Sequence, residues 1–439
     1  MKATSILART LIQFVLITIF FLFLFTVPLK GMPAGVGTRI VFSLLGISLL
    51  IIRSIQNNPL KNLIMPIRTV FMLGITFLLI CVALLSCYIN GTHDLTFIRV
   101  IIGFFLSFLG AYFVITCLSA SYTKISFQLI AQYIIVAATL QVILALLMFL
   151  VPAVRDLVTP VLDQGEFIDD LLQSAKEFRI IGIASNPFAV GLTNCLALML
   201  ICTLIRTEKS RIKVALYTFG YCIILSIGSM MSRTTIIGGA ISLIILFWPE
   251  ALITGKLSTK MLTFLLTIVI IVMAVYLIIL LLPPDILEEL SAASSYGFEV
   301  FINYINGKGV QSDSTNELQE MFIWPSKMQT YLIGDGLFAD PKDPVSYYMG
   351  TDVGYLRLIY FFGIPGMLLF FILQLYPIFV LAATRIINKH ELHFYILTAV
   401  FLLIANIKGE ADIFFFMALF LFVPYIQTRL NTDINLKQF

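Results

Sequence analysis

Long apolar runs, separated by short polar segments, dominate this chain. A helix needs about 20 apolar residues to cross the roughly 30 Å hydrocarbon core of a bilayer. Hydrophobic residues make up 60% of the chain and charged residues only 12%. A soluble domain has about 45–50% apolar and about 25% charged residues, so the bilayer must be the solvent for most of this chain. The runs predict twelve spans, at 10–29, 38–56, 67–89, 98–119, 127–151, 185–205, 213–230, 234–254, 261–282, 354–383, 393–408 and 412–429.

The first apolar run, Leu11 to Leu29, is too long for the core of a signal peptide, and no small-residue cleavage site follows it. We therefore predict an all-α polytopic membrane protein whose first helix is retained. Residues 1–282 would hold helices 1–9 with an outer loop at about 152–184. Residues 283–353 would form a large outer loop subdomain, and 354–439 would hold helices 10–12 and a tail.

Charge is distributed unequally between alternate loops. If both termini are cytoplasmic, the cytoplasmic side holds only four of the 24 acidic residues, namely Glu208, Glu250, Glu391 and Asp433. The short loops on that side are rich in Lys and Arg, as the positive-inside rule requires. The pattern predicts a multi-pass protein of a bacterial inner membrane, with both termini cytoplasmic and its chemistry on the acidic, periplasmic side.

Several common functional signatures are missing. The six cysteines lie in or beside apolar runs without a CxxC pair, which predicts neither disulfides nor a metal site. The chain has no GxxxxGK[ST], HExxH or GxSxG motif and no long cytoplasmic domain for a nucleotide. We expect no cofactor and no nucleic-acid partner.

Basic residues stand at the outer ends of several predicted spans. A cation at a membrane is expensive and usually has a function, and the planar guanidinium matches phosphate oxygens. A cluster of such groups at the outer surface would suit a lipid pyrophosphate. The candidates are Arg39, Arg99, Arg155, Arg179, Arg233, Arg357 and Lys408.

Arg233 lies in GSMMSRTTIIGG, at a tight outer turn before a helix whose free N–H groups favour anions. An arginine that snorkels to lipid headgroups is the alternative. Arg179 stands a few residues before Asn186 and Pro187. Asn186 either contacts substrate or caps the next helix, with Pro187 in the first helical turn.

Arg357 lies about one turn inside the span that opens TDVGYLRLIYFFGIPGMLLFF, a position that snorkelling alone explains poorly. Asp352 stands five residues earlier, a spacing that does not place both side chains on one helix face. It is a helix cap, or a base or hydrogen-bond partner. Lys408 and Glu410 lie in the outer turn IKGEAD, where a solvated loop is the alternative.

Four segments together resemble the bacterial O-antigen ligase and polymerase family. They are GIASNP, MMSRTTIIGGAISLIILF, LIGDGLF and TDVGYLRLIYFFGIPGMLLF, and the resemblance covers about residues 179–370. It implies a GT-C-like membrane glycosyltransferase architecture with a large periplasmic loop between helices 9 and 10. It also implies a metal-independent reaction on sugars linked through pyrophosphate to undecaprenol, in which arginines neutralise the leaving group.

Ligases of the family, which transfer glycan to lipid A core, carry a histidine where this chain has Asp352. The resemblance therefore favours a repeat-unit polymerase for O-antigen, capsule or exopolysaccharide. It implies Arg233, Arg357 and Asp352 as catalytic residues, and Arg179, Asn186, Arg99, Lys408 and Glu410 as substrate-binding ones. Expected partners are the undecaprenyl-pyrophosphate-linked oligosaccharide, membrane lipids, a chain-length regulator and a flippase.

A transporter or flippase for a lipid-linked glycan is the alternative from another class. Transporters place ionisable groups deep in their spans, whereas nearly all charge here lies at span ends. The distribution of charge therefore favours an enzyme.

Overall fold

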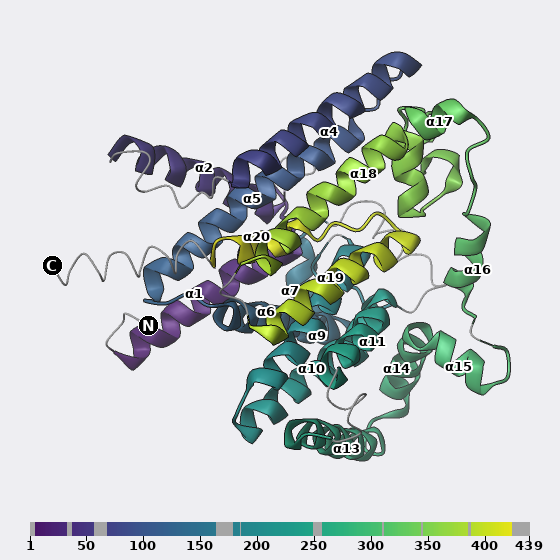
Figure 1. Ribbon diagram of the computed structural model, residues 1–439. Helices are drawn as coiled ribbons and strands as arrows, with labels where there is room; N and C mark the ends of the chain where they lie inside the picture. The colour runs from purple at the N-terminus through teal and green to yellow at the C-terminus, as the bar shows by residue number, and fades with distance from the viewer. Residues whose placement is uncertain are drawn as a thin grey trace. The chain divides into compact units, whose positions relative to one another are not determined.

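A computed structural model describes residues 5–32, 37–56, 68–163, 179–184, 186–248, 257–309, 311–343, 346–384 and 388–423. Within these ranges the regular structure is helical (Figure 1). Nine of the described helices are long and apolar enough to cross a membrane. They are α1 (Ile6–Phe25), α4 (Arg68–Asn90), α5 (Thr96–Ser121), α6 (Phe127–Leu150), α9 (Pro187–Thr207), α10 (Arg211–Met231), α13 (Thr259–Ile279), α18 (Gly354–Ala382) and α19 (Lys389–Lys408).

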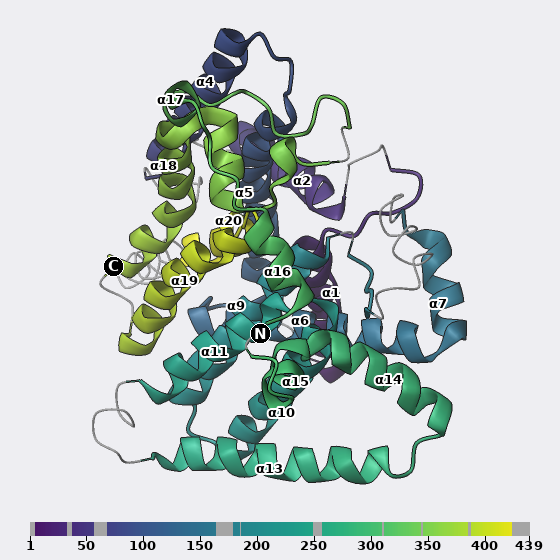
Figure 2. The same ribbon diagram turned by 90° about the vertical axis from the view of Figure 1, so that its right-hand side faces the viewer.

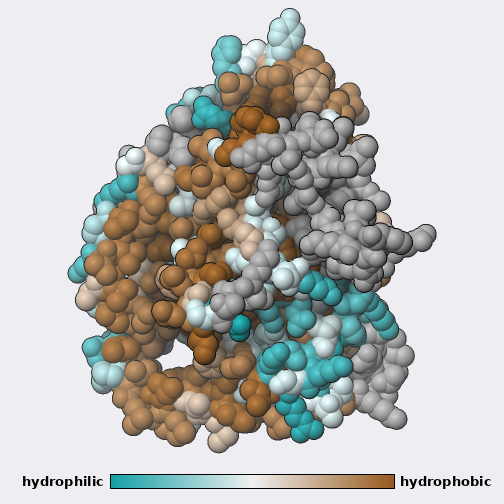
Figure 3. Space-filling view, turned by 90° about the vertical axis from the view of Figure 1, so that its left-hand side faces the viewer, coloured by the Kyte–Doolittle hydropathy of each residue, from teal (hydrophilic) through white to brown (hydrophobic). Residues whose placement is uncertain are grey.

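The three remaining predicted spans also coincide with helices, but with shorter ones. They are α2 (Thr38–Gln56), α11 (Thr234–Phe247) and α20 (Phe414–Leu421). The predicted ends at 254 and 429 lie outside the described residues. Apolar side chains cover much of the coloured surface in Figure 3, as expected for contact with lipid tails. The multi-pass, all-α prediction is thus supported, whereas the number of twelve crossings stays a prediction.

The chain divides into two compact units. Unit 1 comprises Met1–Arg39, Ser126–Gln311 and Asn388–Leu397, and unit 2 comprises Ile40–Ile125, Ser312–Ile387 and Thr398–Phe439. The predicted loop subdomain at 283–353 is shared between them, because the division falls after Gln311. Each unit is described by itself below.

Unit 1 is organised around α9. Every residue of this helix from Val190 to Arg206 is buried. It packs against α1, α6, α10 and α11. The closest approach is to α11, where a Cβ on Gly238 would lie 2.3 Å from the Cα of Cys195. Small residues allow such close packing of membrane helices. The α9–α11 pair therefore fixes the backbone from which the turn at Arg233 projects.

Arg39 has a structural partner in unit 1. Its guanidinium donates to the carbonyl oxygens of Phe23 (3.1 Å) and Leu24 (3.0 Å), at the C-terminal end of α1. These carbonyls have no partner inside the helix, and a cation there also complements the helix dipole. Arg39 thus caps α1.

Unit 2 is organised around α18, which packs against α4, α17 (Met328–Leu332) and α20. Its backbone breaks inside the helix at Phe362 (φ −139°) and Gly363 (φ 70°). A φ of 70° is readily adopted by glycine alone, so Gly363 permits the break. The break divides α18 into a short first segment, Gly354–Phe361, and a longer second one.

The segment predicted as the large outer loop, 283–353, contains four helices. They are α14 (Pro284–Gly297) and α15 (Glu299–Ile305) in unit 1, and α16 (Asp313–Glu320) and α17 in unit 2, followed by a 3-10 turn at Tyr348–Gly350. Figure 2 shows α13 leading into α14 and α15. The first outer loop forms α7 (Pro152–Val158) and a 3-10 turn at Thr159–Val161. Its residues 164–178 lie outside the described ranges.

Candidate functional site: two arginine clusters

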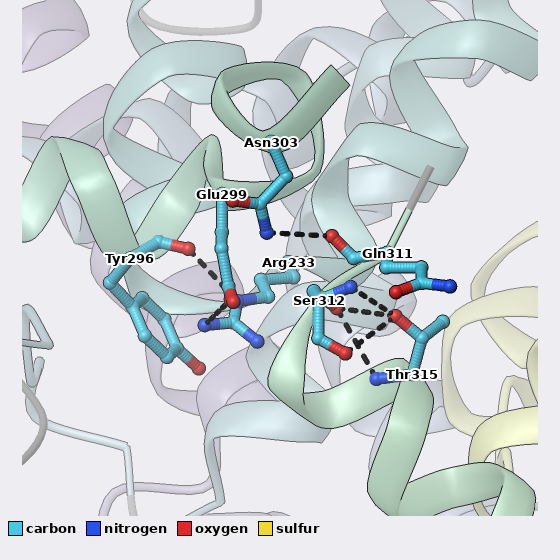
Figure 4. A network of polar contacts seen from close by, with 7 residues as sticks. All are labelled: Arg233, Tyr296, Glu299, Asn303, Gln311, Ser312 and Thr315. Atoms are coloured by element: carbon cyan, nitrogen blue, oxygen red, sulfur yellow. Dashed lines mark hydrogen bonds and ion pairs between the residues drawn. The ribbon is translucent and has the colours of Figure 1, made fainter. Parts of the chain in front are cut away.

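Arg233 occupies the two-residue turn between α10 and α11, where the sequence predicts it. Its Nε donates to the carbonyl of Tyr296 (2.9 Å), and its Nη2 lies 2.5 Å from Oε2 of Glu299. The guanidinium carbon stands 4.2 Å from the centre of the Tyr296 ring, and Figure 4 shows the three groups together. The guanidinium is therefore held by a carboxylate, a carbonyl and an aromatic face.

Arg179 lies on the same tyrosine. Its Nε donates to the carbonyl of Met231 (2.6 Å), and its guanidinium carbon is 5.5 Å from the centre of the Tyr296 ring. We call Arg179, Arg233, Tyr296 and Glu299 the Tyr296 cluster. Its two arginines come from separate segments, so the structure brings together two residues that the sequence predicts for one site.

Asn186 has a local role at the start of α9. Its Oδ1 accepts hydrogen bonds from the backbone N–H groups of Phe188 (2.9 Å) and Ala189 (3.2 Å), and Pro187 follows at the first helical position. The capping alternative for Asn186 is confirmed. A side chain used in this way satisfies two N–H groups that the helix itself leaves unpaired.

Two amide side chains are fully buried in the helices of unit 1. Gln141 of α6 and Asn194 of α9 are 0% exposed, and none of their amide atoms has a hydrogen-bond partner among the described residues. A Cβ added to Gly182 would lie 2.5 Å from Gln141, and one added to Gly228 would lie 2.9 Å from Asn194. An unpaired buried amide costs about 1–3 kcal/mol, so these two positions, which the sequence analysis did not single out, are further candidates for the site.

The second cluster is built on the break in α18. The break frees the carbonyls of Tyr360 and Phe361, which accept hydrogen bonds from the backbone N–H groups of Asp335 (2.6 Å) and Gly336 (3.1 Å). Ser86 of α4 also donates to Phe361 (2.7 Å). Irregular backbone at membrane depth is tolerated where protein surrounds it. The LIGDGLF loop is thereby fixed beside the first segment of α18.

Asp94 fixes the next part of this loop. Its Oδ2 accepts from the backbone N–H groups of Phe338 (2.7 Å) and Ala339 (3.1 Å), and its Oδ1 accepts from Thr96 (2.9 Å). Burial tends to raise the pKa of Asp94, but these hydrogen bonds outweigh it and lower the pKa. An ionised Asp94 therefore holds Phe338 in place.

Arg357 projects from the first segment of α18 and is 9% exposed. Its guanidinium carbon lies 4.0 Å from the ring centre of Phe338 and 3.9 Å from that of Tyr347. Its Nη1 is 3.3 Å from Oδ1 of Asp352, whereas its buried Nε has no hydrogen-bond partner among the described residues. Arg357 is thus a buried cation whose Nε–H donor has no hydrogen-bond partner among the described residues.

Two carboxyl groups accompany Arg357. Burial raises the pKa of Glu410 to about 7, partly opposed by Arg357, while the neighbouring acids Asp412 and Asp352 raise it further. Burial also raises the pKa of Asp352, opposed by Arg357 and then by Lys408. The pKa of Glu410 is thus near neutral, as suits a group that exchanges protons. We call Arg357, Asp352, Glu410, Phe338 and Tyr347 the Arg357 cluster.

Two expectations about this region are wrong or only partly met. Asp352 does not cap α18, because the N-cap residue is Val353 and it makes no side-chain capping bond. Asp352 lies before the helix, so the helical spacing that separates it from Arg357 does not apply. Arg99 is exposed in the first turn of α5, and among the described residues no hydrogen bond or ion pair joins its side chain to the cluster.

Tyr296, Glu299, Phe338 and Tyr347 are the site residues that the sequence analysis missed. All four lie in the large outer loop, where nothing in their spacing marks them. Across the residues that the structure describes, no three His, Cys, Asp or Glu side chains gather as metal ligands. No family model, no curated protein and no solved structure matches this chain.

Proposed function

We propose that this protein is a membrane glycosyltransferase that joins undecaprenyl-pyrophosphate-linked oligosaccharide repeat units into a surface polysaccharide. The observation that carries the proposal is the pair of arginines on Tyr296. Two guanidiniums at 4.2 and 5.5 Å from one ring repel each other, and an anion between them relieves that repulsion. A pyrophosphate bears several negative charges and matches the donor fork of arginine.

The Tyr296 cluster has donors to offer such an anion. In the described part of the chain Arg179 uses only its Nε–H for a hydrogen bond, so its terminal amino groups are available. Arg233 is paired with Glu299 instead. We assign Arg179 as the group that first meets the pyrophosphate, and Glu299 as the carboxylate that the pyrophosphate displaces from Arg233.

The Arg357 cluster supplies the chemistry. A hydroxyl of the acceptor glycan attacks the anomeric carbon, the bond from that carbon to the pyrophosphate oxygen breaks, and the lipid pyrophosphate leaves with the bonding electrons. Glu410 in its ionised form takes the proton of the attacking hydroxyl. Arg357, held against the rings of Phe338 and Tyr347, stabilises charge that develops on the leaving group.

A polymerase also explains why the chain has two arginine clusters. Its donor and its acceptor are both lipid-linked, and each carries a pyrophosphate. Each compact unit contains one cluster with a buried or half-buried guanidinium on an aromatic face. We assign the donor pyrophosphate to the Arg357 cluster and the acceptor pyrophosphate to the Tyr296 cluster.

The test is polymer formation by the purified full chain in liposomes with undecaprenyl-pyrophosphate-linked repeat units. We expect a ladder of products, and its loss in Arg179→Gln and Arg357→Gln. Arg155→Gln is the matched control, because Arg155 is also predicted on the outer side but is exposed and, within the described residues, forms its one ion pair with Asp156 at 3.8 Å. Transfer to lipid A core without a ladder would show a ligase instead.

A transporter is the second candidate, and the break in α18 favours it. Discontinuous membrane helices line the substrate sites of many secondary transporters. Phe362 and Gly363 interrupt α18 in this way. Movement of the lipid-linked unit across the liposome membrane without new glycosidic bonds would replace the polymerase proposal with this one.

A further inference from the structure

A group of large apolar side chains is exposed in unit 2, in the chain that follows α16. We call residues 322–332, which include α17, the 322–332 segment. Trp324 is 60% exposed and Met328 is 70% exposed. The exposed apolar residues of the segment are Phe322, Ile323, Trp324, Met328 and Leu332. Exposed apolar patches mark surfaces that contact another molecule or a membrane.

The backbone of the 322–332 segment is fixed against two membrane helices. The hydroxyl of Tyr360, in α18, donates to the carbonyl of Ile323 (3.1 Å). Nε2 of Gln329, in α17, donates to Oδ1 of Asn90, the last residue of α4 (3.4 Å). Nδ2 of Asn90 in turn donates to the carbonyl of Gly334 (2.9 Å). These bonds hold the apolar side chains of the segment at the ends of α4 and α18.

The place of the segment along α18 indicates its depth in the membrane. A Cβ added to Gly363 would lie 2.7 Å from the carbonyl carbon of Leu332, so the end of α17 is level with the break in α18 (Figure 1). The part of α18 after the break, 363–382, is about 20 residues long, the length that crosses the hydrocarbon core. Asn90, which contacts α17, stands at the end of another span. Both helices therefore place α17 at the boundary between hydrocarbon and headgroups.

The exposed side chains of the segment continue the apolar surfaces of the same two helices. After the break, α18 exposes Ile364, Leu368 and Ile372, which are four residues apart and so lie on one face. Leu332 lies beside the start of this row, at the break. Tyr88, in the last turn of α4, is exposed as well. Apolar side chains on the outside of a membrane span contact lipid tails, so a surface that continues them contacts lipid too.

The composition of the segment suits the interface between lipid and water. From Met321 to Gly334 the sequence has no acidic residue and one basic residue, Lys327, whereas the rest of the predicted outer loop is rich in acids. A lysine can bury its apolar stem and extend its ammonium group to the headgroups. Tryptophan and tyrosine are enriched at membrane–water interfaces, where Trp324 and Tyr88 would lie.

We infer that the 322–332 segment is inserted into the outer leaflet of the bilayer, so that its partner is the lipid surface. Its apolar side chains lie at the boundary between headgroups and acyl chains, as in interfacial membrane anchors. The segment leads directly into the LIGDGLF loop, so this contact also holds the loop that places Phe338 against Arg357. The inference concerns lipid contact alone and does not rest on the proposed function.

Tryptophan fluorescence tests the insertion, because the chain has two tryptophans, Trp248 and Trp324. The full chain with Trp248→Phe is placed in phosphatidylcholine liposomes with or without brominated acyl chains, which quench tryptophans that touch them. We expect brominated chains to remove more than half of the emission, most strongly when the bromine lies near the headgroup. Iodide, present in the water on both sides of the membrane, should quench little.

A tryptophan in the polar part of the same loop is the matched control. Asn316 is exposed in α16, which belongs to unit 2 as the 322–332 segment does. With Trp248→Phe and Trp324→Phe as background, Asn316→Trp should be quenched by iodide and not by brominated chains. Met328→Trp in that background should respond as Trp324 does. The melting temperature in detergent shows whether each variant is folded.

Two results would overturn the inference. If iodide quenches Trp324 as strongly as it quenches Asn316→Trp, the segment lies in water. If neither iodide nor brominated chains quench Trp324 or Met328→Trp, a protein surface covers the segment, and its partner is not lipid. The difference in emission between the wild type and Trp324→Phe gives the Trp324 signal with Trp248 unchanged, so the test holds even if Trp248→Phe does not fold.

Discussion

The two arginine clusters use the same side chain in different electrostatic settings. In the Tyr296 cluster, Arg233 has a carboxylate oxygen at 2.5 Å and is 14% exposed. In the Arg357 cluster, Nη1 of Arg357 lies 3.3 Å from the carboxylate oxygen of Asp352, and the guanidinium lies against two aromatic rings. Its Nε has no hydrogen-bond partner among the described residues. One cation is satisfied by the fold and the other is only partly satisfied.

This difference indicates which cluster is poised for an anion. The ion pair of Glu299 with Arg233 ties α15 to the turn between α10 and α11. Burial instead raises the pKa of both carboxyls beside Arg357. A raised pKa disfavours the ionised form of a carboxyl, so these two groups balance the charge of Arg357 poorly. Arg357 therefore gains more from a bound pyrophosphate than Arg233 does. We therefore expect substitutions in the Arg357 cluster to have the larger effects.

Arg357→Gln should have the largest effect. It removes the cation that accompanies Asp352 and Glu410, so we expect polymerisation to fall by about 10³-fold, the upper range for loss of one preorganised donor. The melting temperature in detergent should fall as well, because the ion pair with Asp352 and the stacking on Phe338 and Tyr347 are lost. Ladder formation in liposomes measures the first effect and thermal unfolding the second.

Arg357→Lys separates charge from shape in the same assay. Lysine keeps the cation but loses the planar fork that stacks between Phe338 and Tyr347. We expect Arg357→Lys to regain much of the stability and little of the activity. Full activity in Arg357→Lys would show that positive charge alone is needed and would weaken the role given to the stacked guanidinium.

Glu410→Gln should lower activity by about 10²-fold and change its pH dependence. The pKa of Glu410 is raised to about 7, and the ionised form is the one that accepts a proton. Activity of the wild type should therefore rise as the pH increases through about 7, and Glu410→Gln should lose that rise. Stability should change in the opposite direction, because a raised pKa stabilises the fold at low pH and this contribution is lost as the pH rises towards 7.

The pH profile of initial rates in liposomes checks this assignment. Asp412→Asn is a structural comparison, because Asp412 accepts from the backbone of Phe414 (2.8 Å) and from Gln374 (3.1 Å). That variant should lose stability and keep an inflection, shifted to lower pH because the charge of Asp412 no longer raises the pKa of Glu410. An inflection that persists in Glu410→Gln would assign the titration to another group.

The sequence alone predicts much of the fold, because hydropathy and helix length decide it. All twelve apolar runs overlap helices of the described residues, whereas the side of the membrane on which each arginine lies stays a prediction. Gly363 illustrates the limit. The local sequence does not predict that α18 breaks at this residue. The break depends on hydrogen bonds from Asp335 and Gly336, in a loop that must first fold against the helix.

The partners of the arginines could not be predicted for the same reason. Glu299 is 66 positions beyond Arg233, and only the packing of α14 on α10 brings the two together. Asp352 shows a different limit. It precedes the N-cap residue Val353, so helical spacing does not apply to it, and its carboxylate lies 3.3 Å from Nη1 of Arg357.

Glu299→Gln tests whether Arg233, whose guanidinium is paired within the fold, also binds substrate. The change removes the charge that competes with a pyrophosphate for Arg233, so we expect the KM for the lipid-linked unit to fall by roughly tenfold, the equivalent of one charged hydrogen bond. Arg233→Gln should raise the KM. Initial rates over a range of substrate concentrations give both values.

A fall in activity without any change in KM would indicate that the Arg233–Glu299 pair only anchors α15. Limited proteolysis of the 284–305 segment reports on that anchoring. It should increase in Glu299→Gln to the same extent as in Arg233→Gln, because both variants break the same ion pair. The difference between the two variants in KM, at equal proteolysis, is what assigns Arg233 to substrate.

Asn194→Leu should give the smallest effect on activity, together with a gain in stability. The amide of Asn194 is 0% exposed and unpaired among the described residues, so replacing it with an apolar side chain of similar size removes a penalty of about 1–3 kcal/mol. If the amide serves function, activity should fall a few-fold while the melting temperature rises. Gln141→Leu, at the second such amide, should behave alike. Unchanged activity in both variants would make these amides structural, and would confine the substrate-binding role in unit 1 to the arginines on Tyr296.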